Sequence, residues 1–171
     1  MKNDISAIGN ALVDTVFKVE HSLIAELGLE IDQMTLSSAD EQAPIIERLI
    51  SSGADTVSDC GGSATNSLVA AASFGAKCFH TCKVSDDKDG VRYLESLKEA
   101  GVGHKGNMAP ASNIPTGKCL ILVTPDAKRT MTTALNVSSL MDESDLDLDQ
   151  IANSKIFYIE GYMVTSKENY K

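Results

Sequence analysis

Short apolar runs alternate with longer amphipathic stretches along this chain. The runs typical of buried strands occupy residues 5–8, 76–84 and 155–159. A glycine pair and a small-apolar helical series lie between the first two runs, and a second helical spacing over 91–100 stops at Gly101. The order of strand, turn, helix and strand predicts an α/β fold with a parallel sheet.

Three other segments read as strands outside this main sheet. Residues 12–19 alternate apolar or β-branched residues with others, which indicates a strand exposed on one face. Residues 116–123 and 129–135 flank the polar segment 124–128, which is typical of a hairpin turn. These segments predict a second, smaller sheet.

Two further helices are predicted with less regular boundaries. Ser38 and Glu41 match a capping box, but Pro44 favours a helix that begins only near the proline. The acidic segment 142–149 predicts a surface helix with a solvated charged face, and residues 166–171 resemble the opening of another helix.

Gly61 and Gly62 lead directly into the small-apolar helical series. Glycine permits a sharp turn and close approach to a ligand, and the first amides of a helix lack intrahelical partners. Ser63, Thr65 and Asn66 add donors and acceptors suited to hydroxyl groups. The same pattern also fits an ordinary glycine turn before a core helix, and the spacing alone leaves both interpretations open.

Polar residues follow two of the predicted parallel strands. Asn10 and Asp14 come after the first strand, and Glu160 and Tyr162 come after the last. Ligands of open α/β sheets collect beyond the carboxyl ends of the strands, so these side chains are candidate ligands. Alternatively, Asn10 turns the chain and Asp14 is a solvated strand residue.

Composition narrows the possible partners and locations. The 171 residues are 43% apolar and 23% charged, enough for one sizeable core, and the net charge of −9 argues against nucleic acid. No apolar run reaches membrane-spanning length and no signal peptide is evident, so we expect a cytoplasmic protein without membrane contact. The four cysteines lack Cys-x-x-Cys spacing, and the aspartates at 86–89 fit a helix start better than a cation site, so no metal site is predicted.

Three separated motifs carry a family resemblance: Gly9-Asn10 with Asp14, the run Gly61-Gly62-Ser63-Ala64-Thr65-Asn66, and Thr116-Gly117-Lys118-Cys119. Together they resemble the N-terminal half of the PfkB/ribokinase family of carbohydrate and nucleoside kinases. Asp32-Gln33 and Tyr158-Ile159-Glu160-Gly161-Tyr162 are most similar to adenosine-kinase-like members. The resemblance covers essentially all 171 residues.

The resemblance implies a ribokinase-like three-layer α/β/α domain with a small β-sheet lid, the C-terminal half being missing. Residues 1–171 would be the N-terminal part of the kinase domain, with lid segments at about 11–20, 54–60 and 116–135. It also implies a possible homodimer through the lid.

Family site residues carry over to matching positions here. Asp14 and Asn66 would bind sugar hydroxyls, with Arg129 as a possible phosphate contact. The remaining implied substrate-binding residues are Asn10, Gln33, Gly61, Gly62, Ser63, Leu122, Met131, Leu135, Glu160 and Tyr162. Glu160 stands where related enzymes have either a small apolar residue or a sugar-binding carboxylate, so it is either a hydroxyl acceptor or an exposed strand end.

The family's Gly-Ala-Gly-Asp element, which carries the catalytic aspartate, does not occur in this sequence, nor does its Asn-x-x-Glu motif. The resemblance implies ATP and Mg²⁺ as cofactors, but their sites would lie mostly outside this chain, and the chain alone is not expected to be active.

The leading hypothesis is therefore the substrate-binding and lid half of an ATP-dependent kinase that phosphorylates a primary hydroxyl of a nucleoside, adenosine first, or a sugar. The alternatives are a sugar kinase of ribokinase or fructokinase type and a non-catalytic sugar- or nucleoside-binding module. A dinucleotide-binding domain is weaker, because no Gly-x-Gly-x-x-Gly is present.

Overall fold

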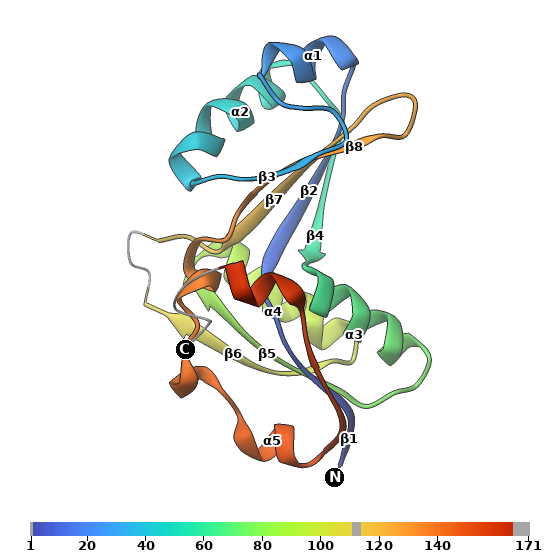
Figure 1. The fold of residues 1–171 in the computed structure, drawn as a ribbon, viewed down its shortest axis with the longest axis vertical. Coiled ribbons are helices and arrows are strands. Elements are labelled where there is room, and N and C mark those ends of the chain that lie inside the picture. Colours follow the sequence, from blue (N-terminus) through green and yellow to red (C-terminus); the bar gives the residue numbers. More distant parts are fainter. Residues whose placement is uncertain (1, 111–113, 166–171) are drawn as a thin grey trace.

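A four-stranded parallel sheet forms the lower half of the molecule in Figure 1. The computed structural model describes residues 2–110 and 114–165. The strands follow the order β6-β5-β1-β9. Their bounds are β1 Asn3–Ile8, β5 Cys78–Ser85, β6 Gly103–Ala109 and β9 Ser154–Ile159.

Helical segments cover both faces of this sheet. Alternate residues of a strand point to opposite faces, so Ala7 packs in the cluster that contains Leu68 and Leu97, whereas Ile8 packs with Met141 and Met163. One face carries α3 (Ser63–Ser73) and α4 (Lys88–Glu99). The other carries the short helices η1 (Asn136–Leu140), η2 (Glu143–Asp145) and α5 (Leu148–Ala152), and η3 (Gly161–Thr165) follows β9. The expected three-layer α/β/α arrangement is confirmed.

A second sheet of five strands forms the upper half of Figure 1. Its order is β3-β8-β7-β2-β4, with bounds β2 Leu12–Lys18, β3 Met34–Leu36, β4 Thr56–Gly61, β7 Gly117–Val123 and β8 Arg129–Ala134. The helices α1 (His21–Glu26) and α2 (Ala39–Ser51) lie over one face. That face is buried through Phe17, Leu120 and Leu122, which pack against Ile24 and Leu49.

Several elements differ from the sequence-based prediction. The helix α2 begins at Ala39 and contains Pro44, because both halves of the Ser38–Glu41 capping box form and fix the start. The acidic segment 142–149 is not one solvated helix. Asp145 is buried and accepts a hydrogen bond from Lys83 Nζ at 2.8 Å. The elements α1, β3 and β6 were not predicted, and residues 166–171 lie outside the described part.

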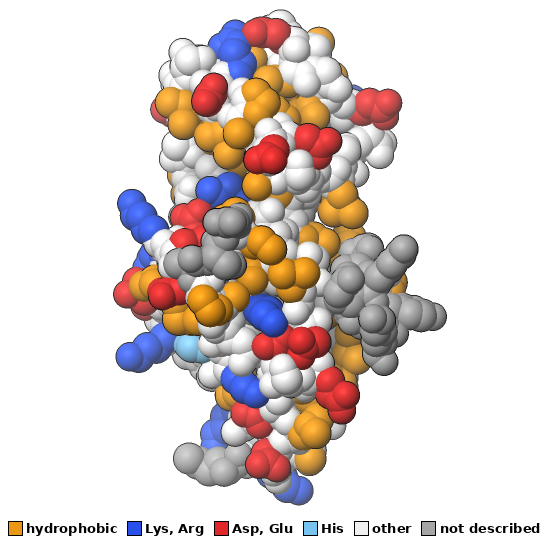
Figure 2. Space-filling view, turned by 90° about the vertical axis from the view of Figure 1, so that its left-hand side faces the viewer, with side chains coloured by type: hydrophobic (Ala, Val, Ile, Leu, Met, Phe, Trp, Pro, Cys, Tyr) orange, Lys and Arg blue, Asp and Glu red, His pale blue; other side chains and the backbone are white. Residues whose placement is uncertain are grey.

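The surface of the described residues carries both signs of charge. Figure 2 shows acidic and basic side chains interspersed on one face, with hydrophobic side chains gathered over its middle. No helix in the described part of the chain is long and apolar enough to cross a membrane.

Candidate functional site

A cavity of about 320 Å³ lies where the two sheets meet. The ends of β1 and β9 and the start of α3 supply one wall, and the five-stranded sheet supplies the other. We call it the inter-sheet cavity. Its lining residues are Asn10, Leu12, Asp14, Met34, Leu36, Gly62, Ser63, Asn66, Cys119, Ile121, Arg129, Met131, Thr133, Leu135, Glu160 and Tyr162.

Asp14 places a carboxylate in this cavity. It lies in β2 opposite Asp59 of β4, and within the described residues its side chain accepts no hydrogen bond. Burial raises the pKa of Asp14 to about 6, an effect that Asp59 reinforces and that Arg129 opposes. The carboxylate is therefore only partly compensated and is suited to accept hydrogen bonds from hydroxyl groups of a ligand.

The glycine pair allows two close approaches at this point. A Cβ atom on Gly61 would lie 2.1 Å from Cγ of Asp14, so the glycine leaves room for that carboxylate in its present position. Gly62 precedes α3 with φ +98°, and a Cβ there would lie 2.4 Å from the Asn10 carbonyl oxygen. The glycines therefore bring the start of α3 against the end of β1.

The polar residues after the glycine pair point in different directions. Asn66 is exposed, lines the cavity and makes no side-chain hydrogen bond to the described residues. Thr65, expected to offer its hydroxyl to a ligand, instead points into the core and hydrogen-bonds to Tyr93 Oη and, at 3.3 Å, His80 Nε2. Complete burial lowers the pKa of His80 to about 4, so this network is neutral near pH 7.

Glu160 is buried and fully hydrogen-bonded, so it is not an exposed strand end. Its Oε1 accepts from Asn10 N at 2.7 Å and from Asn10 Nδ2 at 2.8 Å. Its Oε2 accepts from Ser63 Oγ at 2.7 Å and from Ala64 N at 2.9 Å. The Asn10 amide oxygen in turn accepts from Ser138 Oγ at 3.3 Å. Glu160 lines the cavity, but four protein donors occupy its acceptor positions, so its expected role as an acceptor for ligand hydroxyls stays a prediction that would require displacing one of them.

An apolar wall from β3, β7 and β8 faces these polar groups. Met131 and Leu135 belong to this wall, but Leu122 does not. Leu122 is fully buried on the opposite face, among the residues that pack under α1 and α2. The period-two alternation of β7 explains the correction, since Cys119 and Ile121 share the cavity face while Leu122 points away.

Other predicted residues have peripheral positions. Gln33 is exposed and does not line the cavity, although its carbonyl oxygen accepts from Met131 N at 2.8 Å. Arg129 and Tyr162 line the cavity and are both exposed. Six further residues line the cavity without having been predicted: Leu12, Met34, Leu36, Cys119, Ile121 and Thr133. The alternation of the hairpin could have indicated Cys119 and Ile121, whereas Met34 and Leu36 belong to a three-residue strand without a sequence signal.

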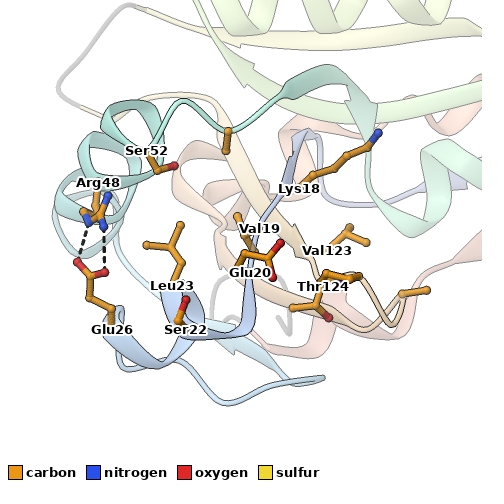
Figure 3. A pocket seen from close by; sticks show the side chains of 13 residues that line it. Lys18, Val19, Glu20, Ser22, Leu23, Glu26, Arg48, Ser52, Val123 and Thr124 are labelled. Carbon is orange, nitrogen blue, oxygen red and sulfur yellow. Dashed lines mark hydrogen bonds and ion pairs between the residues drawn. The ribbon is translucent and has the colours of Figure 1, made fainter.

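A larger cavity of about 580 Å³ lies at the far end of the five-stranded sheet (Figure 3). Leu23, Val19 and Val123 contribute apolar side chains, and Arg48 donates to both carboxylate oxygens of Glu26, at 2.6 and 2.9 Å. The side chains that could fix a ligand here are thus partly engaged with one another. None of the predicted site residues lines this cavity, so the inter-sheet cavity is the candidate site.

The fold and the cavity at the strand ends define a ribokinase-like α/β protein. The model of the pfkB family of carbohydrate kinases matches residues 28–170, and the chain belongs to this family. No curated protein matches it significantly.

Solved structures show the same arrangement. Adenosine kinase from Sinorhizobium meliloti is 30% identical, with a TM-score of 0.87 over 99% of this chain and 50% of that one. A probable sugar kinase from Rhizobium etli is 25% identical, with a TM-score of 0.89 over 99% and 50% of the two chains. Adenosine kinase from Anopheles gambiae, 23% identical, shares the fold with a TM-score of 0.81 over 98% and 53%. The chain therefore spans about half the length of these proteins.

Proposed function

We propose that this chain is the acceptor-binding and lid part of an ATP-dependent kinase that phosphorylates a primary hydroxyl of a nucleoside, adenosine first, or of a sugar. The observation that carries the proposal is the Asp14 carboxylate, which accepts no hydrogen bond from the described residues and lies in a cavity that also contains Asn66 and an apolar wall. The hydroxyls of a sugar ring would hydrogen-bond to Asp14 and Asn66, and the face of a base would pack against the apolar wall.

The charge of the cavity supports a neutral acceptor. Asp14 and Glu160 both place carboxylates in its lining, and Glu160 already accepts from the first turn of α3. An anionic group at this helix start would meet a carboxylate instead of unpaired amides. We therefore favour an unphosphorylated nucleoside or sugar at this end, and we assign Arg129, which lines the cavity, as a contact for the transferred phosphate.

Family membership supports ATP as the phosphate donor, generally with Mg²⁺. Within the described residues, no group of three or more His, Cys, Asp or Glu side chains is arranged to hold a metal ion. We assign the nucleotide and the metal to none of the described residues. The five-stranded sheet, which carries the apolar wall, would act as the lid over the acceptor.

Calorimetric titration of the full protein with adenosine, inosine, ribose and fructose tests the acceptor class. We expect the nucleosides to bind more tightly than the free sugars, because only they can use the apolar wall. Tighter binding of ribose or fructose would favour the sugar-kinase alternative. The similarity to the probable sugar kinase from Rhizobium etli also supports that alternative. Binding without ADP formation from ATP would favour the non-catalytic binding module.

A further inference from the structure

The geometry points to Glu160 as a positioning residue that fixes the two halves of the acceptor site without touching the acceptor. The inference rests on the proposed function for what the site binds, but its structural part concerns the protein without ligand. Glu160 is 2% exposed, at the end of β9, and joins segments that lie 150 and 96 residues away in the sequence.

The hydrogen bonds leave Glu160 no capacity for a ligand. An ionised carboxylate has about four acceptor positions, and four donors occupy them at distances of 2.7 to 2.9 Å. The two donors on Oε1 come from Asn10 and the two on Oε2 come from Ser63 and Ala64. A substrate hydroxyl could bind Glu160 only by displacing one of these donors.

The arrangement also replaces the missing cap of α3. Gly62 precedes the helix and has no side chain with which to cap it, so the Ala64 amide takes its acceptor from Glu160. Gly9 leaves room for this contact, because a Cβ there would lie 2.7 Å from Glu160 Oε2 and 2.4 Å from Ala64 Cβ. The start of α3, and with it Asn66, is thereby held at a fixed place relative to β1 and β9.

These contacts require a side chain with two acceptor oxygens at position 160. Each carboxylate oxygen accepts from a main-chain amide, Asn10 N on one side and Ala64 N on the other, and neither amide can accept in return. A glutamine in either amide orientation would place its NH₂ group against one of them. Aspartate would be shorter by one methylene. Neither conservative substitution should therefore restore the site.

Amide hydrogen exchange of the ligand-free full protein tests the structural part. In the wild type we expect the Asn10 and Ala64 amides to be protected, and in Glu160→Gln we expect at least one of them to exchange at least tenfold faster. Glu95→Gln, an exposed position on α4, is the matched control and should leave both amides unchanged. Rapid exchange of both amides in the wild type would overturn the inference whether or not any variant folds.

Titration with adenosine, 2′-deoxyadenosine and 3′-deoxyadenosine tests the positioning role. We expect Glu160→Gln and Glu160→Asp to lower the affinity for all three ligands at least tenfold and by the same factor. In a protein that also carries Asn66→Ala, we expect this loss of affinity to be smaller. If the loss disappeared for one deoxy analogue only, Glu160 would be a direct ligand of the missing hydroxyl and the inference would be wrong. If the wild type bound none of the three while its amides behaved as expected, the proposed function would fail and the structural role of Glu160 would stand.

Discussion

At the residue scale, the raised pKa of Asp14 predicts that ligand binding and folding respond to pH in opposite directions. Its pKa is raised from 3.8 to about 6 by burial. A hydroxyl donor needs the ionised carboxylate, so we expect adenosine affinity to rise with pH, by up to tenfold per unit below about 6, and to level off above it. Titration from pH 5 to 8 measures this. A pH-independent affinity in the wild type would contradict the assignment of Asp14.

The same shift predicts a stability effect in the absence of ligand. The protonated carboxyl favours the folded state. Its contribution to the free energy of unfolding is therefore complete below about pH 3.8 and is lost as the pH rises through about 6. Asp14→Asn should therefore raise the free energy of unfolding at pH 7 by about 1 kcal/mol, after allowance for solvent screening, and should unfold at a higher urea concentration than the wild type. Near pH 4 the variant should be no more stable than the wild type. An Asn variant less stable at pH 7 would contradict the burial argument.

Gly62 tests how closely α3 must approach β1. Gly62→Ala should lower the free energy of unfolding by about 3 kcal/mol or more. The alanine would have both a left-handed φ and a Cβ 2.4 Å from the Asn10 carbonyl oxygen. Gly75→Ala is the matched control, since Gly75 has φ +90° with nothing within 4 Å of an added Cβ, and should cost only about 1 to 2 kcal/mol. Equal midpoints of urea unfolding would show that the close approach is not required.

At the element scale, Asp87 connects α4 to the strand that carries part of the apolar wall. Its Oδ1 accepts from Gly90 N and from Thr116 Oγ1, both at 2.7 Å, and its Oδ2 accepts from Thr116 N at 2.8 Å. Asp87→Ala should therefore lower the free energy of unfolding by about 2 to 4 kcal/mol. Ser38→Ala, which removes only a helix cap, should lower it by about 1 kcal/mol. Equal losses in urea unfolding would mean that the contacts to Thr116 contribute nothing.

Elements with a strong local signal could be predicted from the sequence, and those fixed by partners could not. The strands at 5–8 and 155–159 follow from their apolar runs, and the hairpin follows from the polar turn between two apolar segments. The strand β6 (GHKGNMA) has no such pattern and forms because β5 supplies its hydrogen bonds.

The candidate site shows the same division. Glycine and polar motifs indicated where the cavity lies. Leu122, assigned from the family resemblance, was misplaced because it lies on the face of β7 that packs under α1 and α2. The hydrogen bonds of Glu160 join residues up to 150 positions apart, and no local pattern reveals them.

At the scale of the whole molecule, β9 is an edge strand within the described residues and exposes apolar side chains. Ile156, Phe157 and Ile159 are 58%, 41% and 54% exposed. We therefore expect the 171-residue chain, expressed by itself, to self-associate, because an open sheet edge and apolar surface favour pairing. Ile156→Lys should reduce the mass measured by light scattering, whereas the control Phe74→Lys, at an exposed position that follows α3, should not. A wild-type chain that stays monomeric would contradict this expectation.

The homodimer through the five-stranded sheet stays a prediction. Its edge strand β4 leaves Val57 72% exposed, which supports such pairing. Val57→Lys in the same light-scattering series distinguishes that contact from association through β9.

The central claim is that the inter-sheet cavity binds the hydroxyl-bearing acceptor, and a crystal structure of the full protein with adenosine tests it most directly. We predict ribose hydroxyls within hydrogen-bonding distance of Asp14 and Asn66, the base against Met131 and its neighbours, and the four hydrogen bonds of Glu160 intact. Adenosine bound in the larger cavity beside Leu23 and Arg48, or ribose hydroxyls that leave Asp14 without a contact, would contradict the account.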